Sequence, residues 1–102
     1  MPALMISQVE VTDQEKFQEY FAQTRTIGAK YGAKAVARGN QAKTLNGQDD
    51  GHQMVVVVEF PSMEKLDAWF ASEEYKSIIP LREAGSHQHM VAYEAQDVPQ
   101  QL

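Results

Sequence analysis

Near the N-terminus, hydrophobic and polar residues alternate along the chain from Met5 to Val11. A period of two is typical of a strand with one face more buried than the other, so we expect a strand over residues 3–11. After it, large residues recur at spacings of three and four, at Phe17, Tyr20, Phe21, Thr24, Ile27 and Tyr31. This spacing predicts a helix that follows the strand and presents one apolar stripe.

Local signals bound this helix and place a second strand after it. Thr12 and Glu15 have the spacing of a capping box, and Gly32 is a residue that favours a left-handed helix stop. A short strand is expected over Ala33–Arg38. The following residues, 39–51, are rich in Gly, Asn, Gln and Asp, which predicts a long hairpin connection.

The third expected strand, Gln53–Phe60, contains four consecutive valines, Val55–Val58. A strand that is apolar at consecutive positions is buried on both faces. A single layer of helices can cover only one face of a sheet. The valine run therefore predicts that something else covers the other face.

Two Ser-capped segments follow the valine strand. Ser62 is expected to cap a helix whose inner face carries Met63, Leu66, Trp69 and Phe70. Ser72 is expected to cap a further turn in which Tyr75 faces inward and which Pro80 ends or kinks. A last strand is expected over about residues 86–95.

The predicted order is strand, helix, strand, strand, helix, strand. With right-handed crossovers, this order gives an α+β, ferredoxin-like split β-α-β fold (βαββαβ), an antiparallel four-stranded sheet with both helices on one face. We expect one domain over residues 1–96 and a flexible C-terminal tail over residues 97–102. The doubly apolar Val55–Val58 run predicts that the open sheet face packs against a second copy, as a symmetric homodimer.

Composition narrows the class of protein. A net charge of −5 argues against a nucleic-acid partner, and no apolar run approaches the roughly 20 residues needed to span a membrane. The absence of cysteine excludes disulfides and fits a reducing compartment. The N-terminal segment lacks the basic and apolar regions of a signal peptide, so a cytoplasmic location is expected.

Several short motifs lie along the chain, at Asp13, Tyr20, Tyr31-Gly32-Ala33, Ala37-Arg38-Gly39, Glu59-Phe60-Pro61-Ser62, Trp69, Ser72-Glu73-Glu74-Tyr75 and Leu81-Arg82. Together they resemble one known family, the small proteins grouped as domain-of-unknown-function family 1330 within the dimeric α/β-barrel superfamily. The resemblance covers Met5 to about Ala95. Two positions depart from the family pattern: members more often have Gly where Ala33 stands and Pro where Glu73 stands.

This resemblance implies a ferredoxin-like protomer and a homodimer in which two sheets form a shared barrel. It implies no established reaction. Relatives in the wider superfamily include cofactor-independent monooxygenases, muconolactone-type isomerases and haem-binding enzymes, and several place a ligand between the sheet and its own helices. A shared fold does not determine function.

Two histidines are candidate acid–base groups. His87 and His89 lie two residues apart on the expected last strand, so their side chains point the same way. The spacing also permits two metal ligands, but no third ligand is placed by spacing, so we expect no metal. A structural position near the start of the strand remains the alternative for both histidines.

Two arginines and three aromatic residues are candidate ligand-binding groups. Arg38 ends a strand made otherwise of Ala and Val, and its guanidinium can clamp a carboxylate, pair with a glutamate or lie in solvent. Arg82 has similar alternatives, with a structural bond to a helix C-terminus or an acid across the dimer as the first. Aromatic residues at helical spacing are core residues first and pocket lining second. The aromatic candidates are Tyr20, Trp69 and Tyr75.

Two functions follow as hypotheses. The first is a homodimer that binds a small carboxylic or aromatic metabolite in a cleft between sheet and helices, with oxygenase or isomerase activity that needs no cofactor. The second is a non-enzymatic dimerisation or interaction module without a small-molecule substrate. The chain contains no nucleophile elbow, P-loop, dinucleotide fingerprint or HExxH motif, so whether it is an enzyme stays open.

Overall fold

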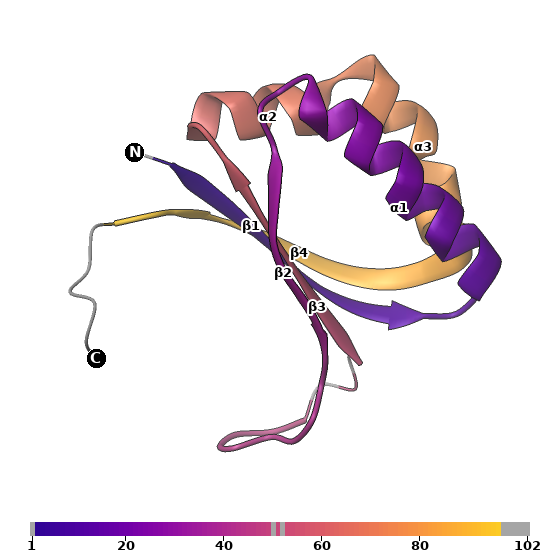
Figure 1. The fold of residues 1–102 in the computed structure, drawn as a ribbon. Helices are drawn as coiled ribbons and strands as arrows, with labels where there is room; N and C mark the ends of the chain where they lie inside the picture. The colour runs from indigo at the N-terminus through magenta and orange to yellow at the C-terminus, as the bar shows by residue number, and fades with distance from the viewer. Residues whose placement is uncertain (1, 50, 52, 97–102) are drawn as a thin grey trace.

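Four strands and three helices follow one another along the chain (Figure 1). The structure is a computed structural model that describes residues 2–49, 51 and 53–96. The predicted tail, residues 97–102, lies outside the described residues. The elements are β1 (Ala3–Val11), α1 (Gln14–Ala29), β2 (Lys34–Asn40), β3 (Met54–Phe60), α2 (Met63–Ala71), α3 (Glu73–Gly85) and β4 (Ser86–Glu94).

The strands form one antiparallel sheet in the order β2-β3-β1-β4. In Figure 1 the three helices all lie on the same side of this sheet, with α1 packed along α3. This arrangement confirms the predicted α+β, ferredoxin-like fold. The second half of the chain carries two helices where the sequence predicted a helix and a turn.

The two faces of the sheet differ in burial. On β1, Met5, Ser7 and Val9 are buried on the helix side, whereas Leu4 and Ile6, on the other face, are half-buried. The valine run of β3 is likewise buried on one face in the single chain, because Val56 is 7% exposed and Val55 is 36% exposed. No described segment covers this second face, which we call the open face.

The helix caps agree with the sequence in part. Ser62 and Ser72 accept hydrogen bonds from Lys65 N and Tyr75 N, as predicted. The predicted capping box at Thr12 is wrong, because Asp13 is the N-cap of α1 and accepts from Lys16 N. Thr12 instead donates its own backbone N–H to the Gly85 carbonyl, together with that of Asp13. The start of α1 is therefore tied to the end of α3.

Two further expectations on the helical layer need correction. The segment after Ser72 is a helix of 13 residues that continues through Pro80, not a single turn that ends there. Phe70, expected on the inner face of α2, is 43% exposed. Gly32 has the positive φ of +78° expected of it, although α1 already ends at Ala29.

The hydrophobic core lies between the sheet and the helices. Two strands, β1 and β3, and all three helices contribute to it, and Met90 of β4 packs against it while partly buried. It comprises Ala3, Met5, Val9, Phe17, Tyr20, Ile27, Val56, Phe60, Leu66, Trp69, Tyr75 and Ile78. No helix among the described residues is long and apolar enough to cross a membrane.

Candidate functional site

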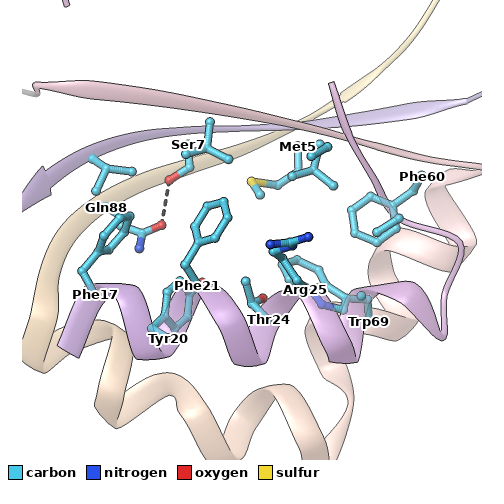
Figure 2. Close-up of a pocket in the computed structure, with 16 residues that line it drawn as sticks. Met5, Ser7, Phe17, Tyr20, Phe21, Thr24, Arg25, Phe60, Trp69 and Gln88 are labelled. Carbon is cyan, nitrogen blue, oxygen red and sulfur yellow. Dashed lines mark hydrogen bonds between the residues drawn. The ribbon is translucent and has the colours of Figure 1, made fainter. Parts of the chain in front are cut away.

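A cavity of about 310 Å³ lies between the helix-side face of the sheet and α1 (Figure 2). Its floor is formed by β1 and β3, its roof by α1, and its end wall by Trp69 of α2. The volume is near the lower end of the range for small-molecule sites. The lining residues are Met5, Ser7, Val9, Phe17, Tyr20, Phe21, Thr24, Arg25, Gly28, Ala33, Ala35, Val56, Val58, Phe60, Trp69 and Gln88.

Small residues leave the space open at the end of the cavity next to α2. Gly28 has no side chain, and a Cβ at this position would lie 3.1 Å from the Cβ of Ala33 and 3.8 Å from Trp69 Nε1. Ala33 and Ala35 are also small. Larger residues here would close the gap between α1, β2 and Trp69.

A chain of hydrogen bonds runs along the floor of the cavity. Ser7 Oγ donates to Gln88 Oε1 at 2.8 Å, and Gln88 Nε2 donates to Ser86 Oγ at 3.0 Å. Ser86 Oγ in turn donates to the Arg82 carbonyl at 2.9 Å. Ser7 Oγ uses its proton in this chain and keeps lone pairs that can accept, whereas Gln88 keeps a second N–H that is not used in it.

Two polar atoms of the lining have no hydrogen-bond partner among the described residues. They are the Thr24 hydroxyl oxygen and Trp69 Nε1, and both are buried. The Thr24 hydroxyl makes no bond of good geometry, but it lies near enough to the Tyr20 hydroxyl to lower the pKa of Tyr20 slightly against the larger effect of burial, so Trp69 Nε1 is the clearer unpartnered donor. Thr24 and Gly28 lie one helical turn apart on α1, and Gly28 lies beside Trp69 Nε1, so the two atoms occupy the same end of the cavity. We call this end, next to Thr24 and Trp69 Nε1, the acceptor site, because the indole N–H can only donate.

Tyr20 is held from behind by a buried polar network. Its hydroxyl lies 2.9 Å from that of Tyr75, to which Arg82 Nη1 donates at 3.0 Å. A guanidinium can only donate, so Tyr75 accepts from Arg82, and either tyrosine can be the donor in the bond between the two hydroxyls. The Tyr75 hydroxyl also lies 3.8 Å from Met90 Sδ, and where it donates to Tyr20 the Tyr20 proton is free for another acceptor.

The environment keeps the Tyr20 phenol protonated. Burial, and secondarily the neighbouring Tyr75 hydroxyl, raise the pKa of Tyr20 far above the ordinary value for tyrosine. At neutral pH this group is therefore a hydrogen-bond donor or a weak acid, and not a base.

The four ligand-binding candidates on the helices fall into two layers. Tyr20 and Trp69 line the cavity, and their role as ligand-binding residues stays a prediction. Tyr75 and Arg82 lie behind Tyr20 and do not line the cavity. Arg82 also pairs with Glu83 at 2.9 Å, so its observed contacts are within the chain and structural.

Arg38 lies on the helix side of the sheet because of a β-bulge. The register of β2 shifts between Ala35 and Ala37, which places Arg38 opposite the inward-facing Val56. Its guanidinium carbon lies 4.6 Å from the centroid of the Phe21 ring, within cation–π range. Since Phe21 lines the cavity and Arg38 does not, Arg38 lies at the edge of the site.

The two candidate histidines lie on the other face of the sheet. His87 pairs with Glu10 and His89 with Gln8, both on the open face, whereas the intervening Gln88 lines the cavity. Arg38 and the histidines therefore do not converge on one site. Any acid–base role of either histidine is confined to the open face.

Several lining residues were not singled out from the sequence. Ser7 could have been found from the sequence, because it is a polar residue between Met5 and Val9 on the face of the alternating strand that is expected to be buried. Thr24 lay within the recognised stripe of α1, but its hydroxyl was not considered. Arg25 follows it in the chain and gave no signal, because exposed arginines are common on helices.

The lining of the cavity carries positive charge and no negative charge. Arg25 is the charged residue of the lining, which includes no Asp, Glu or His. Among the described residues, no group of three or more His, Asp or Glu side chains lies close enough to hold a metal ion. The arrangement suits a small ligand with a flat apolar body and an acceptor group.

Comparison with known proteins places this fold in a wider group. The architecture is that of the ferredoxin-like α+β proteins. The chain belongs to a family described as "domain of unknown function (DUF1330)", whose model matches residues 2–96. None of the curated proteins compared with the sequence matches it.

Solved structures share the fold at low sequence identity. A protein of unknown function from Rhodopseudomonas palustris has a TM-score of 0.81 at 19% identity, covering 95% of this chain and 84% of its own. A dimeric ferredoxin-like protein of unknown function from Jannaschia sp. has a TM-score of 0.73 at 12% identity, covering 93% and 100%. SnoaB, a cofactor-independent oxygenase from Streptomyces nogalater, has a TM-score of 0.68 at 14% identity, covering 98% of each chain.

Proposed function

We propose that this protein is a homodimer that binds a small carboxylic or aromatic metabolite in the cavity between the sheet and α1. The observation that carries the proposal is the cavity itself, about 310 Å³ with aromatic walls and a few convergent polar groups. Sites for small molecules have this composition, because apolar walls supply affinity and a few polar atoms orient the ligand.

Oxygenation or isomerisation without a bound cofactor is the reaction class we assign to the site if it is catalytic. SnoaB provides a precedent for cofactor-independent oxygenation on this fold. The Tyr20 hydroxyl, supported by Tyr75 and Arg82, is a donor suited to stabilise a developing oxyanion. A proton abstraction would need a base from the ligand or from solvent, because the lining residues supply no carboxylate or imidazole. Binding is accordingly the better supported part of the proposal.

The open face of the sheet supports the homodimer. Leu4, Ile6, Val57 and Val91 are only half-buried there, and Tyr93 is 49% exposed. The registers of β1 with β3 and β4 place these residues side by side. Contiguous exposed apolar surface marks an interaction site, and a second copy presents the same surface. The same face would also serve a dimerisation module that binds no small molecule, so occupancy of the cavity separates the two functions.

Native mass spectrometry of freshly purified protein, with Ala35→Leu as a comparison, tests this proposal. Ala35 lines the cavity, and a larger side chain there fills part of it. Ala29→Leu is the matched control, because Ala29 is exposed on α1 and does not line the cavity. We expect a mass of two chains plus a small adduct in the parent protein and the control, and loss of the adduct in Ala35→Leu.

Two other outcomes would contradict the proposal, each in a different way. A dimer that carries no adduct, and that binds no member of a panel of aromatic acids, would favour the interaction module. An adduct that survives Ala35→Leu unchanged would place the ligand elsewhere on the protein.

A further inference from the structure

We infer that the ligand is a planar aromatic carboxylate of one or two rings, whose carboxylate occupies the acceptor site and pairs with Arg25. This inference rests on the proposed function and narrows it to one class of ligand. Three features of the cavity carry it: the sign of its charge, the two unpartnered polar atoms, and the shape of its apolar part.

The charge of the site selects an anion. Arg25 is the charged residue of the lining, and in Figure 2 its guanidinium extends from α1 into the space below Met5. Among the described residues Arg25 has no ion pair, whereas Arg82 is paired with Glu83. A guanidinium recognises a carboxylate by paired hydrogen bonds, and no lining acid competes for it.

The unpartnered atoms select an acceptor next to that charge. Trp69 Nε1 can only donate, and the Thr24 hydroxyl can donate as well. Leaving a buried donor without a partner is costly, so an oxygen that accepts from either group is favoured at this position. Thr24, Arg25 and Trp69 all line the cavity, and Figure 2 shows the Arg25 guanidinium between Met5 on one side and Thr24 and Trp69 on the other, so one carboxylate can reach both the acceptor site and the guanidinium.

The rest of the cavity selects a flat body. Phe21, Phe60 and Trp69 contribute ring faces or edges, and Met5 and Val58 contribute aliphatic surface. Aromatic rings pack against one another in offset or edge-to-face geometry with favourable energy beyond area burial. The volume of about 310 Å³ is sufficient for a flat body of one or two fused rings.

Two competing occupants make different predictions. An ordered water in the acceptor site would satisfy Thr24 and Trp69 Nε1 without any preference for charge in the ligand. A neutral aromatic ligand would use the walls and not Arg25. Binding of a charged probe and of its neutral analogue is therefore compared in the parent protein and in Arg25→Gln. This comparison distinguishes the ordered water and the neutral ligand from the proposed carboxylate.

The chain offers a direct reporter, because Trp69 is its single tryptophan. In ¹⁵N-labelled protein the indole N–H of Trp69 gives a single signal, which shifts when a ligand binds beside it or accepts its hydrogen bond. We propose to titrate this signal with 2-naphthoate and with its neutral analogue 2-naphthamide. The titrations are repeated in Arg25→Gln and in Lys16→Gln, the latter an exposed cation of α1 that does not line the cavity.

The expected result is tighter binding of 2-naphthoate than of 2-naphthamide in the parent protein. Arg25→Gln should weaken 2-naphthoate by about two- to fivefold, the size expected for the ion pair of an exposed arginine, and leave 2-naphthamide unchanged. Lys16→Gln should leave both affinities unchanged. Thr24→Val should weaken both probes, because each places an acceptor oxygen in the acceptor site.

Two results would overturn the inference, and they are distinguishable. Equal affinities for the two probes, with no effect of Arg25→Gln, would reject the aromatic carboxylate while the cavity remained a binding site. No movement of the Trp69 signal with either probe would reject the proposed aromatic-ligand function together with the inference.

Discussion

The Tyr75 hydroxyl is the centre of the buried network behind the cavity. Tyr75 is fully buried, and its hydroxyl bonds both Tyr20 and Arg82. Tyr75→Phe removes this partner from two groups and adds none. We expect the free energy of unfolding to fall by about 1–3 kcal/mol, the cost of leaving buried polar groups unsatisfied. Urea denaturation measures this change.

Tyr31→Phe is the matched control for that substitution. Tyr31 is half-buried, and its hydroxyl makes no hydrogen bond among the described residues. We expect a change within roughly 0.5 kcal/mol, as for most substitutions away from a specific contact. If both variants lost stability equally, the Tyr20–Tyr75–Arg82 network would contribute nothing particular.

Tyr20 gives the protein a pH dependence at the alkaline end. Because the pKa of Tyr20 is raised in the folded state, the folded protein keeps this proton at pH values where the unfolded chain has lost it. Its contribution to stability is therefore complete below about pH 10 and falls as the pH rises further, by up to roughly 1.4 kcal/mol per pH unit.

Denaturation curves of the parent protein and Tyr20→Phe at pH 8 to 11 test this dependence. The phenylalanine variant should be the less stable one at pH 8, because it lacks the hydrogen bond to Tyr75. The difference should shrink above about pH 10, since the variant has no phenol to ionise at this position. Parallel curves across the whole range would contradict the raised pKa.

At the scale of elements, the end of α3 and the start of α1 meet at Gly85. A Cβ at this position would lie 2.6 Å from Phe17 N and 2.9 Å from the carbonyl carbon of Lys16, both backbone atoms that cannot rotate away. Gly85→Ala should therefore push the two helices apart and lower the free energy of unfolding by about 1–3 kcal/mol. Thermal or urea denaturation measures the loss.

Gly39→Ala is the corresponding control on β2. A Cβ at Gly39 would meet nothing within 4 Å, and Gly39 is not among the glycines with positive φ. We expect no loss of stability, or a gain of up to about 1 kcal/mol from the reduced freedom of the unfolded chain. A large loss in Gly39→Ala would show that glycine in general, and not the helix contact, is responsible.

The elements themselves were largely predictable, because they depend on local periodicity. Alternation in β1, the stripe of α1 and the Ser caps at Ser62 and Ser72 are properties of short windows of sequence. The N-cap of α1 was misjudged because Thr12 and Asp13 are both good caps, and the local sequence does not decide between them. Thr12 uses its backbone N–H for the Gly85 carbonyl, 73 residues away, and no local pattern contains that contact.

The candidate site was less predictable, because it depends on how elements face each other. The alternation of side chains along a strand places His87 and His89 on the same face of the sheet, but it does not say which face. The sheet register shows that Gln88, between them, faces the cavity. The position of Arg38 depends on a β-bulge, which reverses the facing of later residues in β2 and has no reliable signal in a single sequence.

At the scale of the whole molecule, two layers leave one surface without cover. Figure 1 shows the helices on one side of the sheet, and part of the other side is apolar, formed by Leu4 and Ile6 of β1, Val55 and Val57 of β3, and Val91 and Tyr93 of β4. Ile6 and Val57 pair at the centre of this open face. Burying it against a second copy removes contiguous apolar surface from water, which is the main driving force for association.

Val57→Glu places a charge at that centre and tests the proposed dimer. We expect the parent protein to sediment as a dimer at micromolar concentration and Val57→Glu as a monomer, because two buried, unpaired carboxylates near a two-fold axis are strongly unfavourable. Ala68→Glu is the control, since Ala68 is exposed on α2 in the helical layer. Circular dichroism shows whether each variant is folded. A parent protein that sediments as a monomer, or a folded Val57→Glu that remains a dimer, would exclude this face as the interface and require another explanation for the apolar run of β3.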